Sequence, residues 1–273
     1  MAYIHMDLYS RALQRTVSVR AFIPADKAIY ESRTLPTKKP FKTLYLLNGY
    51  FGSDIDWLAA GKLHYLATTY NIAVILPSGE NKFYVDQVGT GEAFGRFIGE
   101  DLVEQTRRIF NLSDKREDTF IAGLSMGGYG ALRNGLRYAD TFGYVVALSP
   151  GIVDEEFLDA QARAKAPGFS ESYVASPAYL TSIFGTVDRH IGSDNDIRAL
   201  YDGLAKSGRQ IPKLYLACGS EDMLVIGSVR KLRDWLSERN ADLVYDEGPG
   251  IHDYNFWNEH IILAAENFLP TEK

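Results

Sequence analysis

The chain has 273 residues, of which 46% are apolar and 23% are charged, with a formal net charge of −6. This length and composition predict one large hydrophobic core, so we expect a single domain over residues 1–273. The excess of acidic over basic residues and the lack of a run of basic residues argue against a nucleic-acid partner. Because the sequence lacks a secretory signal and an apolar stretch near the roughly 18 residues of a membrane span, we expect a cytoplasmic protein.

In the N-terminal segments, apolar and polar residues alternate with the period typical of half-exposed strands. Residues 4–8 and 15–23 therefore predict an antiparallel hairpin at one edge of a sheet. After a polar connection over 26–40, buried-strand runs alternate with helix-prone stretches. The predicted strands cover 44–47, 72–76, 120–122, 144–148, 214–218 and 243–245, and the predicted helices cover 57–69, 94–110, 129–138 and 257–268. This alternation favours the α/β class, with a mainly parallel central sheet and helices on both faces.

Residues 151–195 interrupt the alternation with an acidic cluster, prolines and scattered aromatic residues. We expect a small cap-like insertion over the substrate pocket, because loops at this edge of the sheet border the segment after 120–122. The alternative is an ordinary surface insertion. An acidic cap would weakly repel polyanionic substrates.

The motif Gly-Leu-Ser-Met-Gly at 123–127 lies between a buried-strand run and a helix-prone stretch. In this context a serine sits on a sharp strand-to-helix turn with its hydroxyl exposed, which predicts a nucleophile at Ser125. The alternative is a serine that merely caps the helix.

Hydrolases of this architecture place an acid and then a histidine after the serine in the chain. His252 follows a predicted strand and a Gly-Pro-Gly turn, and we predict it as the base. The other four histidines fit this place less well: His5 on a solvated strand, His64 on a helix, His190 in a polar loop and His260 on the last helix. For the acid, Glu221 and Asp222 both follow strand 214–218, and alternation does not separate them.

Acyl transfer also needs two donors for the developing oxyanion. One is expected from the backbone N–H of Met126, directly after the nucleophile. The other should come from the loop Asn48-Gly49-Tyr50-Phe51-Gly52, where the N–H of residue 49, 50 or 51 could serve. An Asn-Gly pair is also a common turn without any function.

Several segments occur together in one order along the chain. They are Leu46-Leu-Asn-Gly49, Gly123-Leu-Ser-Met-Gly-Gly-Tyr-Gly-Ala131, Ala147-Leu-Ser-Pro-Gly151, Cys218-Gly-Ser-Glu-Asp222 and Gly250-Ile-His-Asp-Tyr-Asn-Phe-Trp257. From Tyr3 to Phe268 the chain resembles the esterase D group of α/β-hydrolases, and most closely its bacterial tributyrin esterase branch.

The resemblance implies an α/β-hydrolase fold and a triad of Ser125, Asp222 and His252. It also implies oxyanion donation by the backbone N–H groups of Tyr50 and Met126. Many relatives carry histidine where this chain has Asn48, so a substrate contact inferred from that histidine does not carry over.

The expected function is that of a serine carboxylesterase, which cleaves small short-chain acyl esters through an acyl-enzyme and needs no cofactor or metal. A feruloyl or acetyl sugar esterase and an S-formylglutathione hydrolase are the alternatives, followed by an acyltransferase and an inactive binding homologue. The expected partner is a small-molecule ester, and the family suggests a homodimer or homotetramer. The aromatic candidates for the pocket lining are Tyr50, Phe51, Trp57, Tyr129 and Trp257, and each could equally belong to the core.

Overall fold

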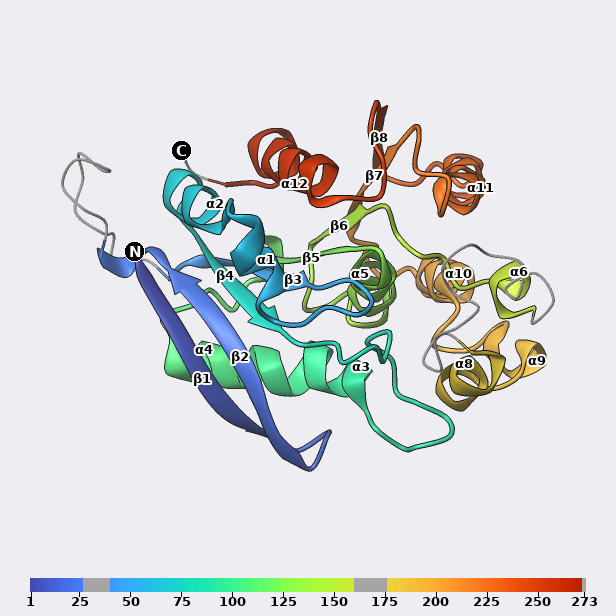
Figure 1. Ribbon diagram of the computed structural model, residues 1–273, viewed down its shortest axis with the longest axis horizontal. Helices are drawn as coiled ribbons and strands as arrows, with labels where there is room; N and C mark the ends of the chain where they lie inside the picture. The colour runs from blue at the N-terminus through green and yellow to red at the C-terminus, as the bar shows by residue number, and fades with distance from the viewer. Residues whose placement is uncertain (27–39, 160–175, 272–273) are drawn as a thin grey trace.

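A single twisted sheet runs through the molecule in the computed structural model, which describes residues 1–26, 40–159 and 176–271 (Figure 1). Its eight strands have the order β1-β2-β4-β3-β5-β6-β7-β8. The strands are β1 (Ala2–Ser10), β2 (Arg15–Ile23), β3 (Lys42–Leu47), β4 (Ile72–Pro77), β5 (Thr119–Leu124), β6 (Tyr144–Leu148), β7 (Lys213–Gly219) and β8 (Leu243–Gly248). The β1–β2 hairpin is antiparallel and β2 pairs antiparallel with β4, whereas β3 to β8 are parallel. The predicted edge hairpin and parallel sheet are confirmed.

Both faces of the sheet are covered by helices, because successive strand side chains point to opposite sides. Leu44 and Leu46 pack on one face, against α1 (Asp56–Ala60), α2 (Leu63–Thr69) and α12 (Tyr254–Asn267). Tyr45 and Leu47 pack on the other face, together with α4 (Leu102–Ile109), α5 (Met126–Arg137), α10 (Ile197–Ser207) and α11 (Ile226–Ser237). The fully apolar centre of β3 to β6 follows from this double coverage.

Two predicted helices differ in the structure. The helix predicted over 57–69 is two helices, α1 and α2, because Gly61 adopts a left-handed φ of 91° and ends the first. The helix predicted over 94–110 contains a π-helical turn, η2 (Phe97–Asp101), between α3 (Phe94–Arg96) and α4. Short 3₁₀ turns complete the connections at η1 (Pro24–Asp26) and η3 (Arg116–Asp118).

The start of α5 at Met126 is earlier than the predicted helix over 129–138. Glycines at the start of α5 lower its helix propensity, but they allow the helix to pack closely against the sheet. A Cβ on Gly127 would lie 2.6 Å from the carbonyl oxygens of Leu47 and Asn48, so only glycine allows α5 to approach β3 this closely.

The predicted insertion contributes three short helices, α6 (Glu155–Leu158), α8 (Pro177–Phe184) and α9 (Val187–His190), and its residues 160–175 lie outside the described ones. His190 is buried at the end of α9, so the prediction of a loop was wrong there. Its Nε2 donates to the Val153 carbonyl at 3.0 Å, and this buried contact orders a segment too short to show periodicity. The role of 151–195 as a cap stays a prediction.

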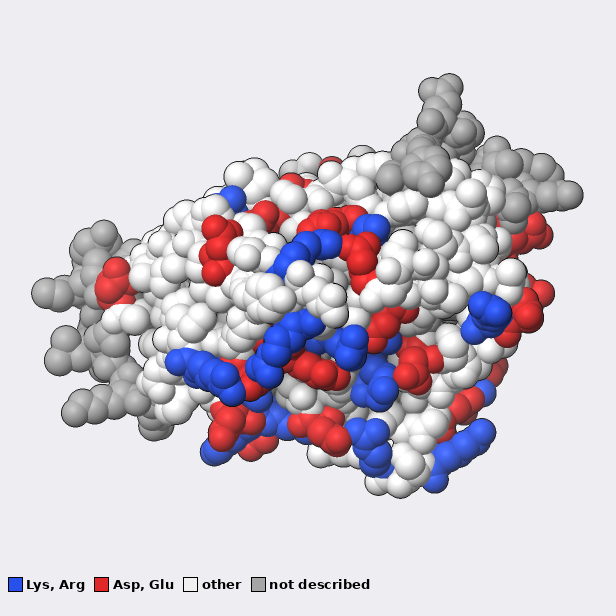
Figure 2. All heavy atoms as spheres, turned by 90° about the horizontal axis from the view of Figure 1, so that it is seen from below, with Lys and Arg blue, Asp and Glu red and all other residues white. Residues whose placement is uncertain are grey.

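Charged side chains of both signs are interspersed on the face seen in Figure 2. Among the described residues, no helix combines the length and apolarity needed to cross a bilayer, and no three His, Cys, Asp or Glu side chains gather as metal ligands.

Candidate active site

Ser125 occupies a strained turn between β5 and α5, with φ 53° and ψ −117°. Backbone bonds hold this turn on both sides. The Ser125 N–H donates to the Leu148 carbonyl at 2.9 Å, and the Gly151 N–H donates to the Ser125 carbonyl at 3.0 Å. Strain of this kind persists only where the surroundings impose it, and it is frequent at functional sites. The conformation is the one predicted for a nucleophile elbow.

A continuous hydrogen-bond chain runs from Ser125 through His252 to Asp222. His252 Nε2 lies 3.0 Å from Ser125 Oγ, and His252 Nδ1 lies 2.7 Å from Asp222 Oδ2. Asp222 is 1% exposed, and its carboxylate also accepts from the Leu224 N–H at 3.3 Å. Because a carboxylate accepts the Nδ1–H, the Nε2 atom is left free to take a proton from the hydroxyl.

The structure shows that Asp222, and not Glu221, contacts the His252 imidazole, a choice that the strand pattern alone left open. The Ser220 N–H donates to the Gly248 carbonyl at 2.7 Å, and the Glu221 N–H donates to the Gly250 carbonyl at 3.0 Å. These bonds join the loop after β7 to the loop that carries His252. In this register Asp222 is buried beside the imidazole and Glu221 is exposed.

The remaining histidines lie apart from this chain of bonds. His5 is exposed on β1 and bonds to Ser18, and His64 is exposed on α2. His260 is buried on α12, where its Nδ1 donates to the Phe256 carbonyl at 2.9 Å. Asp253, next to His252, caps α12 by accepting from the N–H of Phe256 at 3.1 Å. His5, His64 and His260 thus lie on the strand and the helices predicted for them.

The oxyanion-loop candidates lie directly beside the elbow. A Cβ on Gly49 would lie 3.6 Å from the Ser125 Cβ. Met126 is the first residue of α5, so its N–H has no carbonyl partner one turn earlier in the helix. The Phe51 N–H donates to Asn81 Oδ1 at 2.6 Å. Because this N–H is already engaged, the candidate oxyanion donors of the loop are the N–H groups of Gly49 and Tyr50.

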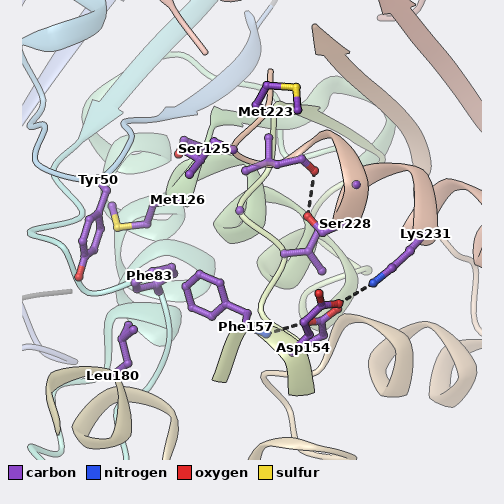
Figure 3. A pocket seen from close by; sticks show the side chains of 16 residues that line it. Tyr50, Phe83, Ser125, Met126, Asp154, Phe157, Leu180, Met223, Ser228 and Lys231 are labelled. Atoms are coloured by element: carbon purple, nitrogen blue, oxygen red, sulfur yellow. Dashed lines mark hydrogen bonds and ion pairs between the residues drawn. The ribbon is translucent and has the colours of Figure 1, made fainter. Parts of the chain in front are cut away.

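A cavity of about 350 Å³ opens beside Ser125 (Figure 3). Its apolar side carries Tyr50, Met126, Phe83, Phe157 and Leu180, as the figure shows. The Phe83 ring lies 5.1 Å from the Tyr50 ring and 6.2 Å from the Phe157 ring, between centroids. The opposite side is more polar, and there Lys231 forms an ion pair with Glu156.

Of the aromatic residues predicted to line the pocket, only Tyr50 does so. Trp57, Tyr129 and Trp257 are buried core residues, and Phe51 is 60% exposed. The other aromatic residues that line the cavity are Phe83 and Phe157, which were not predicted. Both belong to irregular or very short segments, where no periodic pattern marks a buried side chain.

The thiol of Cys218 lies in the core directly behind Asp222. Its Sγ is 4.0 Å from Asp222 Oδ2. Burial, and to a lesser extent the Asp222 charge, raises the pKa of Cys218 to about 12. A thiol that stays neutral is a poor nucleophile, so Cys218 is a weaker candidate for that role than Ser125.

Comparisons with known proteins agree with this geometry. The family model described as "Putative esterase" matches residues 10–268. An acetyl esterase of Caldicellulosiruptor saccharolyticus is 42% identical over 266 residues, which cover 97% of each chain. A fluorophosphonate-binding serine hydrolase of Staphylococcus aureus is 29% identical with a TM-score of 0.82, and an S-formylglutathione hydrolase of the same organism is 29% identical with a TM-score of 0.79; each match covers 97% of both chains.

The family match spans most of the chain, and the eight-stranded sheet with helices on both faces is the α/β-hydrolase architecture. A serine hydrolase among the structural relatives fits a strained serine hydrogen-bonded to a histidine. The chain therefore belongs to the esterase family and is a serine hydrolase with the α/β-hydrolase fold.

Proposed function

We propose that this esterase hydrolyses small short-chain acyl esters through an acyl-enzyme on Ser125. The observation that carries the proposal is the bond chain with distances of 3.0 Å from Ser125 to His252 and 2.7 Å from His252 to Asp222. The similarity to an acetyl esterase over 97% of the chain supports a small acyl group.

In the proposed reaction, His252 Nε2 takes the hydroxyl proton as Ser125 Oγ attacks the ester carbonyl carbon. Asp222 keeps Nδ1 protonated and stabilises the imidazolium that forms. The N–H groups of Met126 and Tyr50 stabilise the negative oxygen of the tetrahedral intermediate. His252 then protonates the departing alcohol, and a water activated by the same imidazole releases the acid and restores Ser125.

A second candidate is hydrolysis of esters with an aromatic acyl group, such as feruloyl esters. The aromatic side of the cavity, with Tyr50, Phe83 and Phe157, favours it, because aromatic rings pack well edge to face. S-Formylglutathione is a third substrate to compare, because the chain resembles a hydrolase of that thioester.

The test is kcat/KM on acetyl, butyryl and octanoyl nitrophenyl esters, methyl ferulate and S-formylglutathione. The proposal expects the acetyl or butyryl ester to lead. A lead of more than about tenfold for ferulate or the thioester, or 1.4 kcal/mol of transition-state preference, would assign the other substrate class.

The nucleophile is tested separately with Ser125→Ala, which we expect to lose at least about 10³ of the turnover. A fluorophosphonate probe should label the wild-type protein at Ser125 and leave the variant unlabelled. Near-normal turnover by the variant would remove Ser125 from the mechanism. Cytoplasmic location and a homodimer or homotetramer stay predictions, which cell fractionation and light scattering test.

A further inference from the structure

Asn48, at the end of β3, holds together backbone segments that meet beside Ser125. The residue is 1% exposed. Its Oδ1 accepts from the Gly79 N–H at 3.1 Å and lies 2.8 Å from the Tyr84 hydroxyl, whose single proton it shares with the Asn48 backbone carbonyl at 3.0 Å. Its Nδ2 donates to the Gly49 carbonyl at 2.8 Å. The Gly79 N–H can only donate, so the amide oxygen must face it and the amide nitrogen must face Gly49.

The bond to the Gly49 carbonyl also determines where the next N–H points. The Gly49 carbonyl and the Tyr50 N–H belong to one planar trans peptide unit and point in opposite directions. The Gly52 N–H donates to the same carbonyl at 3.3 Å. Rotation of this peptide would break both bonds, so the Asn48 amide fixes the direction of the Tyr50 N–H.

The following peptide is fixed independently. The Phe51 N–H donates to Asn81 Oδ1 at 2.6 Å. Asn81 belongs to residues 79–84, where Glu80, Asn81, Phe83 and Tyr84 have left-handed φ values between 45° and 59°. Left-handed non-glycine residues are costly, and their clustering at a site often serves preorganisation. Here the strained segment delivers both Asn81 and Tyr84 to the oxyanion loop.

We propose that Asn48 is a positioning residue that aims the Tyr50 N–H at the oxyanion, and that the Tyr84 hydroxyl holds the Asn48 amide in the required orientation. The inference rests on the proposed function, in which the Tyr50 N–H is an oxyanion donor. Tyr84 is fully buried, and burial raises its pKa well above the usual value. Its hydroxyl therefore remains a donor over the whole working pH range.

The principal test is Asn48→Asp, which keeps the side-chain shape but replaces the donor to the Gly49 carbonyl with an oxygen. We expect kcat to fall about 10–100-fold with KM within about threefold, a part of the 10²–10³ that one oxyanion donor contributes. Binding of a trifluoromethyl ketone, whose adduct carries an oxyanion, should weaken by a similar factor. Protonation of the introduced carboxyl restores a donor, so the ratio of variant to wild-type kcat should rise as the pH falls.

Tyr84→Phe supplies a second variant, because it removes one hydroxyl and keeps the packed ring. It should lower kcat in the same direction, by about 3–10-fold, since one neutral hydrogen bond to the positioning amide is lost. The matched control is Asn258→Ala on α12. Asn258 also donates to a backbone carbonyl, that of Ala60 at 3.1 Å, and this change should leave kcat within about twofold.

The outcomes separate the inference from the proposed function. Retained activity in Ser125→Ala would refute the proposed function itself. An inactive Ser125→Ala together with unchanged kcat in Asn48→Asp and Tyr84→Phe would leave that function standing and overturn the positioning role. A loss in Asn48→Asp that is matched by Asn258→Ala, or that does not respond to pH, would also overturn it.

Discussion

The indole ring of Trp257 stands perpendicular to the His252 imidazole, with the ring centroids 4.9 Å apart and an interplanar angle of 89°. Trp257 is 5% exposed and belongs to the core of the α12 face. The imidazole thus rests against a rigid wall on one side while Asp222 holds its Nδ1 on another.

Removing this wall should impair catalysis more than binding. We expect Trp257→Leu to lower kcat about tenfold or more at similar KM, since a 1 Å misplacement can cost about 10²-fold. Trp257→Phe should stay within a few-fold, because it keeps a flat ring and Nε1 has no hydrogen-bond partner to lose among the described residues. Steady-state kinetics with a melting curve for each variant make the comparison. Equal kcat in the two variants would argue against the role of the ring.

The two neighbouring acids provide a matched pair. Asp222→Asn should lower kcat by about 10⁴, as an amide in this position favours the wrong imidazole tautomer. Glu221→Gln should change kcat less than about twofold, because Glu221 is exposed. The measurement is turnover of nitrophenyl acetate near neutral pH. If the larger loss followed the change at Glu221, the assignment of the acid would be wrong.

Phe157 should limit the length of the acyl group. It lines the apolar side of the cavity and is half-buried. We expect Phe157→Ala to raise kcat/KM for octanoyl relative to acetyl esters by about tenfold, since the space that the ring leaves should bury about one further methylene of the acyl chain, which is worth roughly that factor.

The control for Phe157→Ala is Phe110→Ala, which removes another half-buried ring that is absent from the cavity lining. The ratio of the two esters should stay at the wild-type value in this variant. A parallel change in both variants would point to a general loosening of the fold.

The stability of the β8 edge should depend on pH through Glu247. Hydrogen bonds from Arg230 and Tyr245 lower the pKa of Glu247 to about 2. A carboxyl with a lowered folded-state pKa stabilises the fold above its unfolded pKa, near 4.3, and this contribution disappears as the pH falls towards 2.

Glu247→Gln should therefore lower the melting temperature at pH 7 by about 2 °C, corresponding to roughly 1 kcal/mol for a partly exposed pair. The difference from wild type should shrink between about pH 4 and pH 2. Glu238→Gln is the control, because Glu238 meets Arg239 only at 4.0 Å and is 75% exposed. A difference that persisted at pH 2 would contradict the assignment to this ion pair.

Much of the fold follows from local patterns, because buried parallel strands leave uninterrupted apolar runs. The strand at 144–148 has the predicted bounds, and the predicted nucleophile lies on the predicted turn. The strand pattern alone did not separate Glu221 from Asp222, because both have the right chemistry at the right strand end, and it was the family resemblance that favoured Asp222. Only the bonds from that loop to the neighbouring one decide which carboxylate is buried.

The pocket was less predictable for a similar reason. Tyr129 and Phe83 are both buried aromatic residues whose rings contact each other, yet only Phe83 lines the cavity. Phe83 reaches the cavity because Phe83 and Tyr84 have a left-handed backbone. A sequence pattern signals this conformation at glycine, but not at residues such as Phe and Tyr. The sequence pattern also gave no sign of the role proposed for Asn48, because the groups that donate to its amide oxygen come from residues 79–84.

The hydrogen-bonded residues Ser125, His252 and Asp222 follow different strands of the sheet, and this affects how activity is lost on unfolding. Ser125 follows the central strand β5, whereas Asp222 and His252 follow β7 and β8, and β8 is the last strand of the sheet and only half-buried. A local opening that detaches β8 would separate His252, the proposed base, from Asp222 and Ser125 while the centre of the sheet remains intact. Enzymatic activity would then decay at lower urea concentrations than the circular dichroism of the backbone, and amide hydrogens of β8 would exchange before those of β5.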